Sequence, residues 1–268
     1  MAFSIIKVER EDRPIYQEGL RRLEKEIRYP LGSDFFYIDH GDDYFRFFDR
    51  LGELSFYIGL NEDKVVACAG ASLRTLPQSD GSLITTWYLC DLKVSPHFRG
   101  EGFLDQVLNL ALADCYEVCP KAYAISMNEP GSKGSRITRW IKRKTKMPFE
   151  EGPALLFFNL EEKNMIQSQE IVENALGPIS FLDVSNEKDI LVGPEGHSMA
   201  LLHVQHGRKE NLGLRNPKQG SLHMLCLPEK DPLALELISM GHGVSAEATV
   251  LQLSIQNVNW RQILTSEI

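Results

Sequence analysis

A turn rich in glycine, set between an apolar strand and an apolar helix, constrains the fold of this chain more than any other segment. The strand-like run ends at Val94, Pro96 stops it from continuing, and a helix with apolar periodicity follows from Leu104 to Cys115. Between them, Arg99-Gly100-Glu101-Gly102 lets the backbone turn tightly. The first N–H groups of such a helix lack intrahelical partners and favour negative charge, so the turn predicts a phosphate or pyrophosphate site.

Periodicity predicts an α/β order for the first part of the chain. The expected strands are Phe3–Val8, Ser55–Leu60, Lys64–Leu73, Leu83–Val94, Lys121–Met127 and Ala154–Leu160. The expected helices are Asp12–Ile27, the helix after the glycine turn, and about Ser135–Lys146. Turn sequences join the second, third and fourth strands into an antiparallel meander. A mixed sheet flanked by helices follows from this order.

The segment Leu31–Phe48 is dense in aromatic residues. Pro30 ends the helix before it, and Gly41-Asp42-Asp43 fits the start of another helix. The rings suit the core of a small helical subdomain, or else an aromatic wall against a substrate.

A length of 268 residues exceeds one minimal domain, so we expect two units, at 1–162 and 163–268. A strand, a helix and a strand over 221–255 parallel the same elements over 122–160, which suggests that the tail is a degenerate half-repeat. Because this smaller C-terminal α/β unit has no similar glycine turn, we expect it to shape an acceptor site or to form a homodimer interface.

The charge balance argues against nucleic acid as a partner. Lys and Arg number 29 against 37 Asp and Glu, a net charge of −8. The N-terminus lacks an apolar signal core and no stretch approaches about 18 apolar residues, so we expect a cytoplasmic chain that does not enter membranes. The five cysteines form no CxxC pair, and the histidines of the tail lack ligand spacing, so we expect reduced thiols and no metal.

The segment from Asp91 to Leu104 resembles the acyl-coenzyme A (acyl-CoA) loop of the GNAT superfamily of N-acetyltransferases. That family places Val-x-Pro at a strand end and then Arg/Gln-x-x-Gly-x-Gly/Ala, which this chain matches at Val94, Pro96, Arg99 and Gly102. The order of elements across residues 3–160 is also similar to that of the family. The resemblance implies a mixed, mostly antiparallel sheet flanked by helices, with acetyl-CoA or another acyl-CoA as co-substrate.

The resemblance also implies which residues hold CoA. The backbone amides of the turn and of the first helical residues would bind the pyrophosphate, namely those of Arg99, Gly100, Glu101, Gly102, Phe103 and Leu104. The pantetheine arm would meet Leu92, Lys93 and Val94, at the end of the splayed fourth strand, and Asn128 after the fifth. The family prefers Gly or Ala at the position of Leu104, whose side chain therefore narrows the expected pocket.

The implied reaction is attack of an amine on the acyl thioester, helped by a base, an oxyanion site and an acid. The family often takes its base from the fourth strand. On the fourth strand of this chain, Asp91 is the only residue with a carboxylate. A structural carboxylate is the alternative, and a bulge would decide which face Asp91 occupies. Trp140 stands where the family places a Tyr that acts as the acid. Either Tyr88, Tyr123 or Ser126 replaces that Tyr, or the thiolate leaves unaided, or the domain is not a catalyst.

Three functions fit these features. The first is an N-acyltransferase that moves an acyl group from acyl-CoA to a primary amine of a small molecule or protein. The second is a non-catalytic acyl-CoA sensor or interaction module, which the absence of the family's Tyr favours. The third takes its acyl group from an acidic carrier protein, which would meet the basic helix around Arg136–Lys146.

Overall fold

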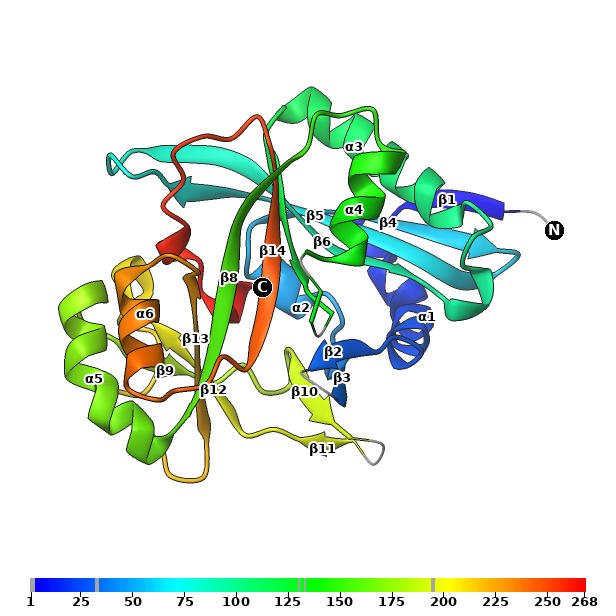
Figure 1. Ribbon diagram of the computed structural model, residues 1–268. Coiled ribbons are helices and arrows are strands. Elements are labelled where there is room, and N and C mark those ends of the chain that lie inside the picture. Colours follow the sequence, from blue (N-terminus) through cyan, green and yellow to red (C-terminus); the bar gives the residue numbers. More distant parts are fainter. Residues whose placement is uncertain (1–2, 32–33, 130, 133, 194–195) are drawn as a thin grey trace.

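Ten strands form one continuous sheet that runs through both expected units (Figure 1). The computed structural model describes residues 3–31, 34–129, 131–132, 134–193 and 196–268. In spatial order the strands are β1 (Phe3–Lys7), β4 (Glu53–Asn61), β5 (Lys64–Pro77), β6 (Leu83–Val94), β7 (Ala122–Met127), β14 (Ala246–Leu253), β8 (Glu150–Glu161), β13 (Leu222–Pro228), β12 (Leu201–Gln205) and β9 (Ser180–Leu182). The pairs β6–β7 and β12–β13 are parallel and the other neighbours antiparallel, which confirms the mixed, mostly antiparallel sheet.

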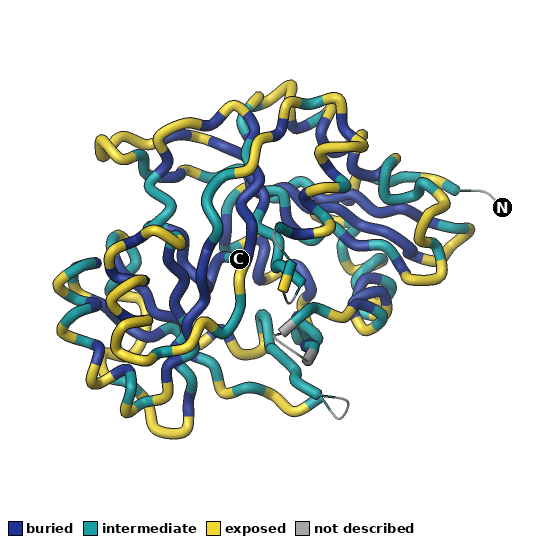
Figure 2. The backbone as a smooth tube through the Cα atoms, viewed as in Figure 1, coloured by how far each residue is buried: buried dark blue, intermediate teal, exposed yellow. Residues whose placement is uncertain are grey.

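Helices cover both faces of this sheet, and Figure 2 shows the strands buried between them. One face, which we call the α1 face, carries α1 (Arg13–Lys25) and the short α2 (Arg46–Asp49). The other, the α3 face, carries α3 (Phe103–Val118), α4 (Arg136–Lys144), α5 (Glu162–Leu176) and α6 (Pro232–Ser239). Strand alternation divides the core accordingly, so that in β8 Leu155 and Phe157 pack on the α1 face whereas Leu156 and Phe158 pack beneath α5 and α6. None of the helices among the described residues has the length and apolar character needed to cross a membrane.

The two copies of the predicted repeat exchange their last strands. β7, α4 and β8 form one copy and β13, α6 and β14 the other, yet β14 lies between β7 and β8. β14 pairs with β7, placing Ala248 opposite Met127, while β8 pairs with β13, placing Leu155 opposite Pro228. Because β8 and β14 also pair with each other, interchanging the two copies reproduces the same order of strands. The expected boundary near residue 162 therefore separates segments that share paired strands.

The aromatic segment differs from the helical subdomain that its sequence suggests. The chain forms β2 (Tyr29–Leu31) and β3 (Asp34–Asp39) there, and α2 adds four helical residues; Gly32 and Ser33 lie outside the described residues. β3 pairs with β10 (Asp189–Val192) of the tail, which also carries β11 (His197–Ser198), in a second sheet of order β11-β10-β3-β2. Pairing with so distant a partner leaves no trace in local periodicity. The core interpretation is confirmed for the rings of Tyr44, Phe45, Phe47 and Phe48, which are buried.

The last residues of the chain run across the α1 face and join both units. Glu267 forms ion pairs with Arg74 of β5 and with Lys209, which follows β12. The Arg50 guanidinium, just after α2, donates to the Ser266 carbonyl at 2.9 Å. Ser266 and Glu267 are both buried, so this segment belongs to the core between the units.

The exchanged strands predict that the fragment 1–162 does not fold alone, because β8 loses both of its partner strands and β7 loses β14. Urea unfolding followed by circular dichroism should show a cooperative transition for the full chain and none for the fragment. Coexpression with residues 163–268 should restore the transition. A cooperative transition of the isolated fragment would show instead that the two units fold separately.

Candidate functional site

The glycine turn has the open backbone that an anion site needs. α3 begins at Phe103, immediately after Gly102, and Gly100 and Gly102 have left-handed φ angles of 87° and 81°. A Cβ atom added to either glycine would meet nothing within 4 Å, so both face open space. Gly102 has no side chain to cap α3, and the first amides of the helix are therefore placed to receive an anionic ligand.

Both ends of this turn are anchored. The main-chain N–H of Ser95 donates to the Val66 carbonyl of β5 at 2.8 Å, and the Ser95 hydroxyl donates to Glu26 at the end of α1. The Phe103 ring stacks on Phe3 of β1 at a centroid distance of 4.2 Å. The glycines thus lie open between two fixed points, which limits the entropy that a ligand must remove.

The strand before the turn has one unpaired edge. β6 pairs with β7 only from Trp87 to Leu89, opposite Ala122 to Ala124, and then the two strands separate. β5 continues along the other edge of β6 as far as Val94. In the part of the chain that the structure describes, no strand pairs with the β7 side of residues 90–94, where we expect the pantetheine arm to lie.

Asn128, the other expected contact of the pantetheine arm, follows β7 at this opening. Its main-chain N–H donates to the Glu247 carbonyl at 2.8 Å, and its carboxamide oxygen accepts a hydrogen bond from Thr249 at 2.7 Å. Both partners belong to β14, so the exchanged strand orients Asn128. The two bonds leave the carboxamide NH₂ group for a ligand.

A bulge at Asp91 interrupts β6 beside the open edge. Asp91 has a φ of 53°, and the pairing with β5 shifts between Cys68 and Gly70. A left-handed conformation costs a non-glycine residue about 1–2 kcal/mol, so the surrounding contacts must hold it. The Asp91 side chain is 3% exposed although the residue as a whole is half-buried, so its main chain supplies the exposed part. The bulge turns this side chain toward the α1 face.

Beneath the bulge lies a largely buried group of polar side chains, which we call the Glu24 cluster: Glu24, Tyr29, His40, Tyr44, Asp91 and Lys93. The Lys93 ammonium forms ion pairs with Glu24 and Asp91 and lies 3.0 Å from the Tyr44 oxygen. Tyr44 donates to Asp91 Oδ2 at 2.7 Å, and Tyr29 donates to Glu24 Oε1 at 3.0 Å. Lys93, expected to contact CoA, therefore directs its side chain into this cluster.

Burial and neighbouring charges move the two carboxyl pKa values of the cluster in opposite directions. Burial raises the pKa of Glu24, and the Lys93 ammonium offsets only part of that effect. Burial also acts to raise the pKa of Asp91, but the Lys93 ammonium and further neighbours hold that pKa below its ordinary value. Burial lowers the pKa of His40 to about 3, so its imidazole is neutral. The lowered pKa keeps Asp91 ionised beside Lys93 and makes it a weak base.

The cluster also contains three groups that could surround a cation. The ligand atoms of Glu24, His40 and Asp91 lie within 4.8 Å of one another. The Lys93 ammonium contacts both carboxylates and already supplies a positive charge between them. The two carboxylates fit this ammonium group as their counter-ion, and we assign no metal to the three residues.

The expected acids lie on the α1 face. Tyr88 and Tyr123 stack with ring centroids 5.0 Å apart, and Trp260 packs 5.6 Å from Tyr123. Burial raises the pKa of both hydroxyls. Their role as acids stays a prediction. Trp140 lies in α4 and packs against the core of the α3 face.

Sequence reasoning missed Glu24, although α1 carries a signal that points to it. Leu20 and Leu23 form the buried stripe of this helix, which Ile27 continues just beyond its end, and Glu24 lies within that stripe with 2% exposure. A carboxylate on the apolar side of an amphipathic helix needs a buried partner. Pairing it with Lys93 required the tertiary structure.

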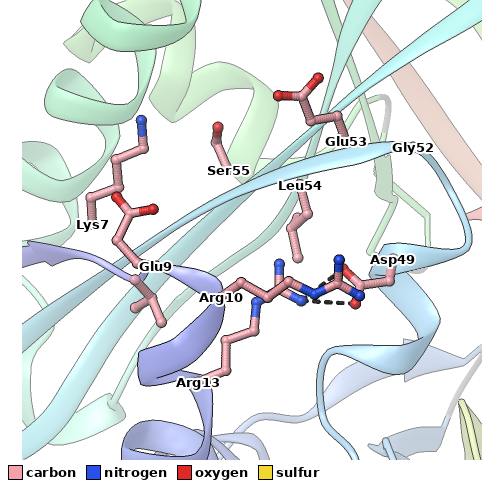
Figure 3. Close-up of a pocket in the computed structure, with 10 residues that line it drawn as sticks. Lys7, Glu9, Arg10, Arg13, Asp49, Gly52, Glu53, Leu54 and Ser55 are labelled. Atoms are coloured by element: carbon pink, nitrogen blue, oxygen red, sulfur yellow. Dashed lines mark hydrogen bonds and ion pairs between the residues drawn. The ribbon is translucent and has the colours of Figure 1, made fainter.

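Two surface cavities lie away from the glycine turn. One of 290 Å³ lies beside the start of α1, where Arg13 Nη1 is 2.8 Å from Asp49 (Figure 3). The other, of 410 Å³, is lined by Gly19 of α1 and by the turn between β4 and β5. Neither cavity is lined by residues of the glycine turn or the Glu24 cluster. The candidate site is therefore defined by its backbone geometry and its charges, and neither cavity is part of it.

Comparison with known sequences finds a relative in a virus. The sequence matches no family model. The uncharacterized protein L340 of Acanthamoeba polyphaga mimivirus is 24% identical over 270 residues, which covers 94% of this chain and 77% of that protein.

Two solved structures superpose on most of the chain. A tandem GNAT protein from the clavulanic acid biosynthesis pathway has a TM-score of 0.53 at 10% identity, covering 94% of this chain and 98% of its own. A proposed acetyltransferase from Pyrococcus horikoshii has a TM-score of 0.54 at 12% identity, covering 98% and 92%. The chain therefore has the fold of the GNAT acetyltransferases, which confirms the fold implied by the glycine turn.

Replacing Gly102 with Trp should abolish binding of acetyl-CoA without unfolding the chain, because the new side chain fills the open space at the turn. Gly81→Trp is the matched control, since Gly81 has a φ of 84°, has nothing within 4 Å of an added Cβ, and lies in the β5–β6 turn. Both substitutions should lower the free energy of unfolding by about 1–2 kcal/mol. Isothermal titration should then detect acetyl-CoA binding in the control alone. Equal binding by the two variants would remove the glycine turn from the site.

Proposed function

We propose that this chain is an N-acyltransferase that moves an acetyl or other acyl group from acyl-CoA to a primary amine of a small molecule or protein. One observation supports this proposal most: the open glycine turn at the start of α3 directly follows the edge of β6 that β7 leaves unpaired. A pyrophosphate at the turn and an extended arm along the edge suit these two features. The GNAT fold of the chain supports the same assignment.

In this proposal the main chain provides most of the contacts to CoA. The amides from Arg99 to Leu104 bind the pyrophosphate, and the Arg99 guanidinium adds a cation. The open edge at Leu92–Val94 pairs with the pantetheine arm, and the Asn128 NH₂ group donates to it. The Leu104 side chain, next to the turn, narrows the space around this arm.

The proposed chemistry is direct attack. The amine nitrogen forms a bond to the thioester carbonyl carbon, the C–S bond breaks, and the thiolate takes up the proton that the amine loses. Main-chain amides at the Asp91 bulge stabilise the oxyanion. Internal contacts hold both the bulge and the glycine turn, which supports a preformed site for this chemistry.

Replacing Asp91 with Asn separates two roles for this residue. Asn tolerates the left-handed conformation and keeps an acceptor for Tyr44, but it cannot take a proton from an amine. Because both Asp91 oxygens are engaged and its pKa is lowered, we expect kcat to fall by less than about tenfold. Asn keeps one oxygen where Lys93 and Tyr44 each use one of Asp91, so hydrogen exchange of residues 90–94 is measured on the same variant. A loss of roughly 10²–10⁴-fold in kcat with unchanged exchange would identify Asp91 as the general base. Release of free thiol from acetyl-CoA, followed with a chromogenic disulfide, measures the rate.

A non-catalytic acyl-CoA sensor is the second candidate, favoured by Trp140 at the position of the expected acid. Titration with acetyl-CoA and free CoA, repeated on Arg99→Ala, tests binding. Thiol release with benzylamine, tyramine, spermidine and a lysine-containing peptide tests transfer. Binding that Arg99→Ala weakens, together with thiol release by one of these amines, supports the acyltransferase; the same binding with no release supports the sensor.

A further inference from the structure

We infer that Glu24 is a positioning residue for the acyl transfer proposed above, on which this inference rests. Glu24 holds Lys93, and Lys93 holds Asp91 in the left-handed conformation that shapes the open edge of β6. Glu24 lies on α1 with a fully buried carboxylate, so it acts on the reaction through these two residues.

The hydrogen bonds of the Glu24 cluster leave one arrangement for Lys93. An ammonium group has three N–H donors, and those of Lys93 meet Glu24, Asp91 and the Tyr44 oxygen. Tyr44 has a single hydroxyl hydrogen, which goes to Asp91 Oδ2 at 2.7 Å rather than to Glu24 Oε2 at 3.3 Å. With every donor engaged, Lys93 cannot rotate without losing a buried hydrogen bond.

Asp91 needs this support more than other residues in similar conformations. The other described non-glycine residues with positive φ lie in turns or bends, whereas Asp91 lies within a strand. Its side chain pairs with Lys93 and Tyr44, and the Cys68 thiol lies 3.2 Å from its carbonyl oxygen. A strained backbone persists only where its surroundings determine it from several sides.

Removing the Glu24 carboxylate would disturb Lys93 first. Lys93 is 5% exposed and Glu24 2% exposed, so water cannot replace the lost acceptor without a rearrangement. The ammonium group would be left with a buried N–H that has no acceptor, and it would turn away from its present position. The contact that fixes Asp91 would loosen as a result.

The effect should fall on the chemical step rather than on CoA binding. The main chain at residues 91–92 is the proposed oxyanion donor, and a misplaced donor loses transition-state stabilisation. The glycine turn is anchored separately by Ser95 and Phe103, so the pyrophosphate contacts should stay in place. A positioning role therefore predicts a lower kcat with an unchanged KM for acyl-CoA.

The test compares three variants of α1 in the full chain. Glu24→Leu removes the carboxylate. Glu24→Gln keeps one oxygen acceptor, which can serve Lys93 in place of the two oxygens that Lys93 and Tyr29 use now. Leu23→Ala is a control that weakens the same buried helix face and removes none of the hydrogen bonds of the cluster. Thiol release from acetyl-CoA is measured with the best amine of the panel at a temperature where circular dichroism shows all variants folded. Hydrogen exchange of residues 90–94 reports on the bulge.

We expect Glu24→Leu to lower kcat by roughly 10- to 100-fold, with the KM for acetyl-CoA within about twofold and faster exchange at residues 90–94. Glu24→Gln should lower kcat by less than about fivefold. Leu23→Ala should keep the wild-type kcat and the wild-type rate of hydrogen exchange at residues 90–94. Equal kcat in Glu24→Leu and Leu23→Ala would overturn the inference and leave the proposed function standing. A wild-type chain that transfers no acyl group to any amine of the panel would overturn both.

Discussion

The Lys93 ammonium, held between Glu24 of α1 and Asp91 of β6, is the interaction on which the rest of the candidate site depends. A buried ion pair stabilises a fold only when well-directed hydrogen bonds offset the lost hydration, and Tyr29 and Tyr44 supply them here. The pair fixes the bulge in β6, and the bulge turns the Asp91 side chain inward and its main chain outward. The open edge and the glycine turn continue from that point.

The two units contribute unequally to this site. β12 and β13 are parallel, as β6 and β7 are, but the connecting residues 206–220 form a 3-10 turn at Gly207–Lys209 and no α-helix. The described residues after β12 therefore lack a helix start comparable to that of α3, whose first amides are placed to receive an anion. Among the contacts of the second unit with the first, β14 orients Asn128, and Glu267 pairs with Arg74 of β5.

Local patterns predicted most helices and strands of the large sheet, because each carries its own apolar periodicity. Local patterns did not predict β3, because its apolar and polar residues alternate only weakly and its partner β10 lies far along the chain. The glycine turn was predictable because Pro96, Gly100 and Gly102 act within a few residues. The Glu24 cluster was not, since it joins residues of α1, the aromatic segment and β6.

The sequence by itself determined the α/β order, the glycine turn before a helix and the GNAT resemblance, because these depend on short-range backbone preferences and on the spacing of a few residues. Tertiary structure alone decided which strands are exchanged and where the Asp91 side chain points. Strand exchange depends on pairing between β7 and β14, and the direction of Asp91 depends on a one-residue bulge held by Lys93. Both are long-range contacts, and a one-residue shift of register reverses the face that a side chain occupies.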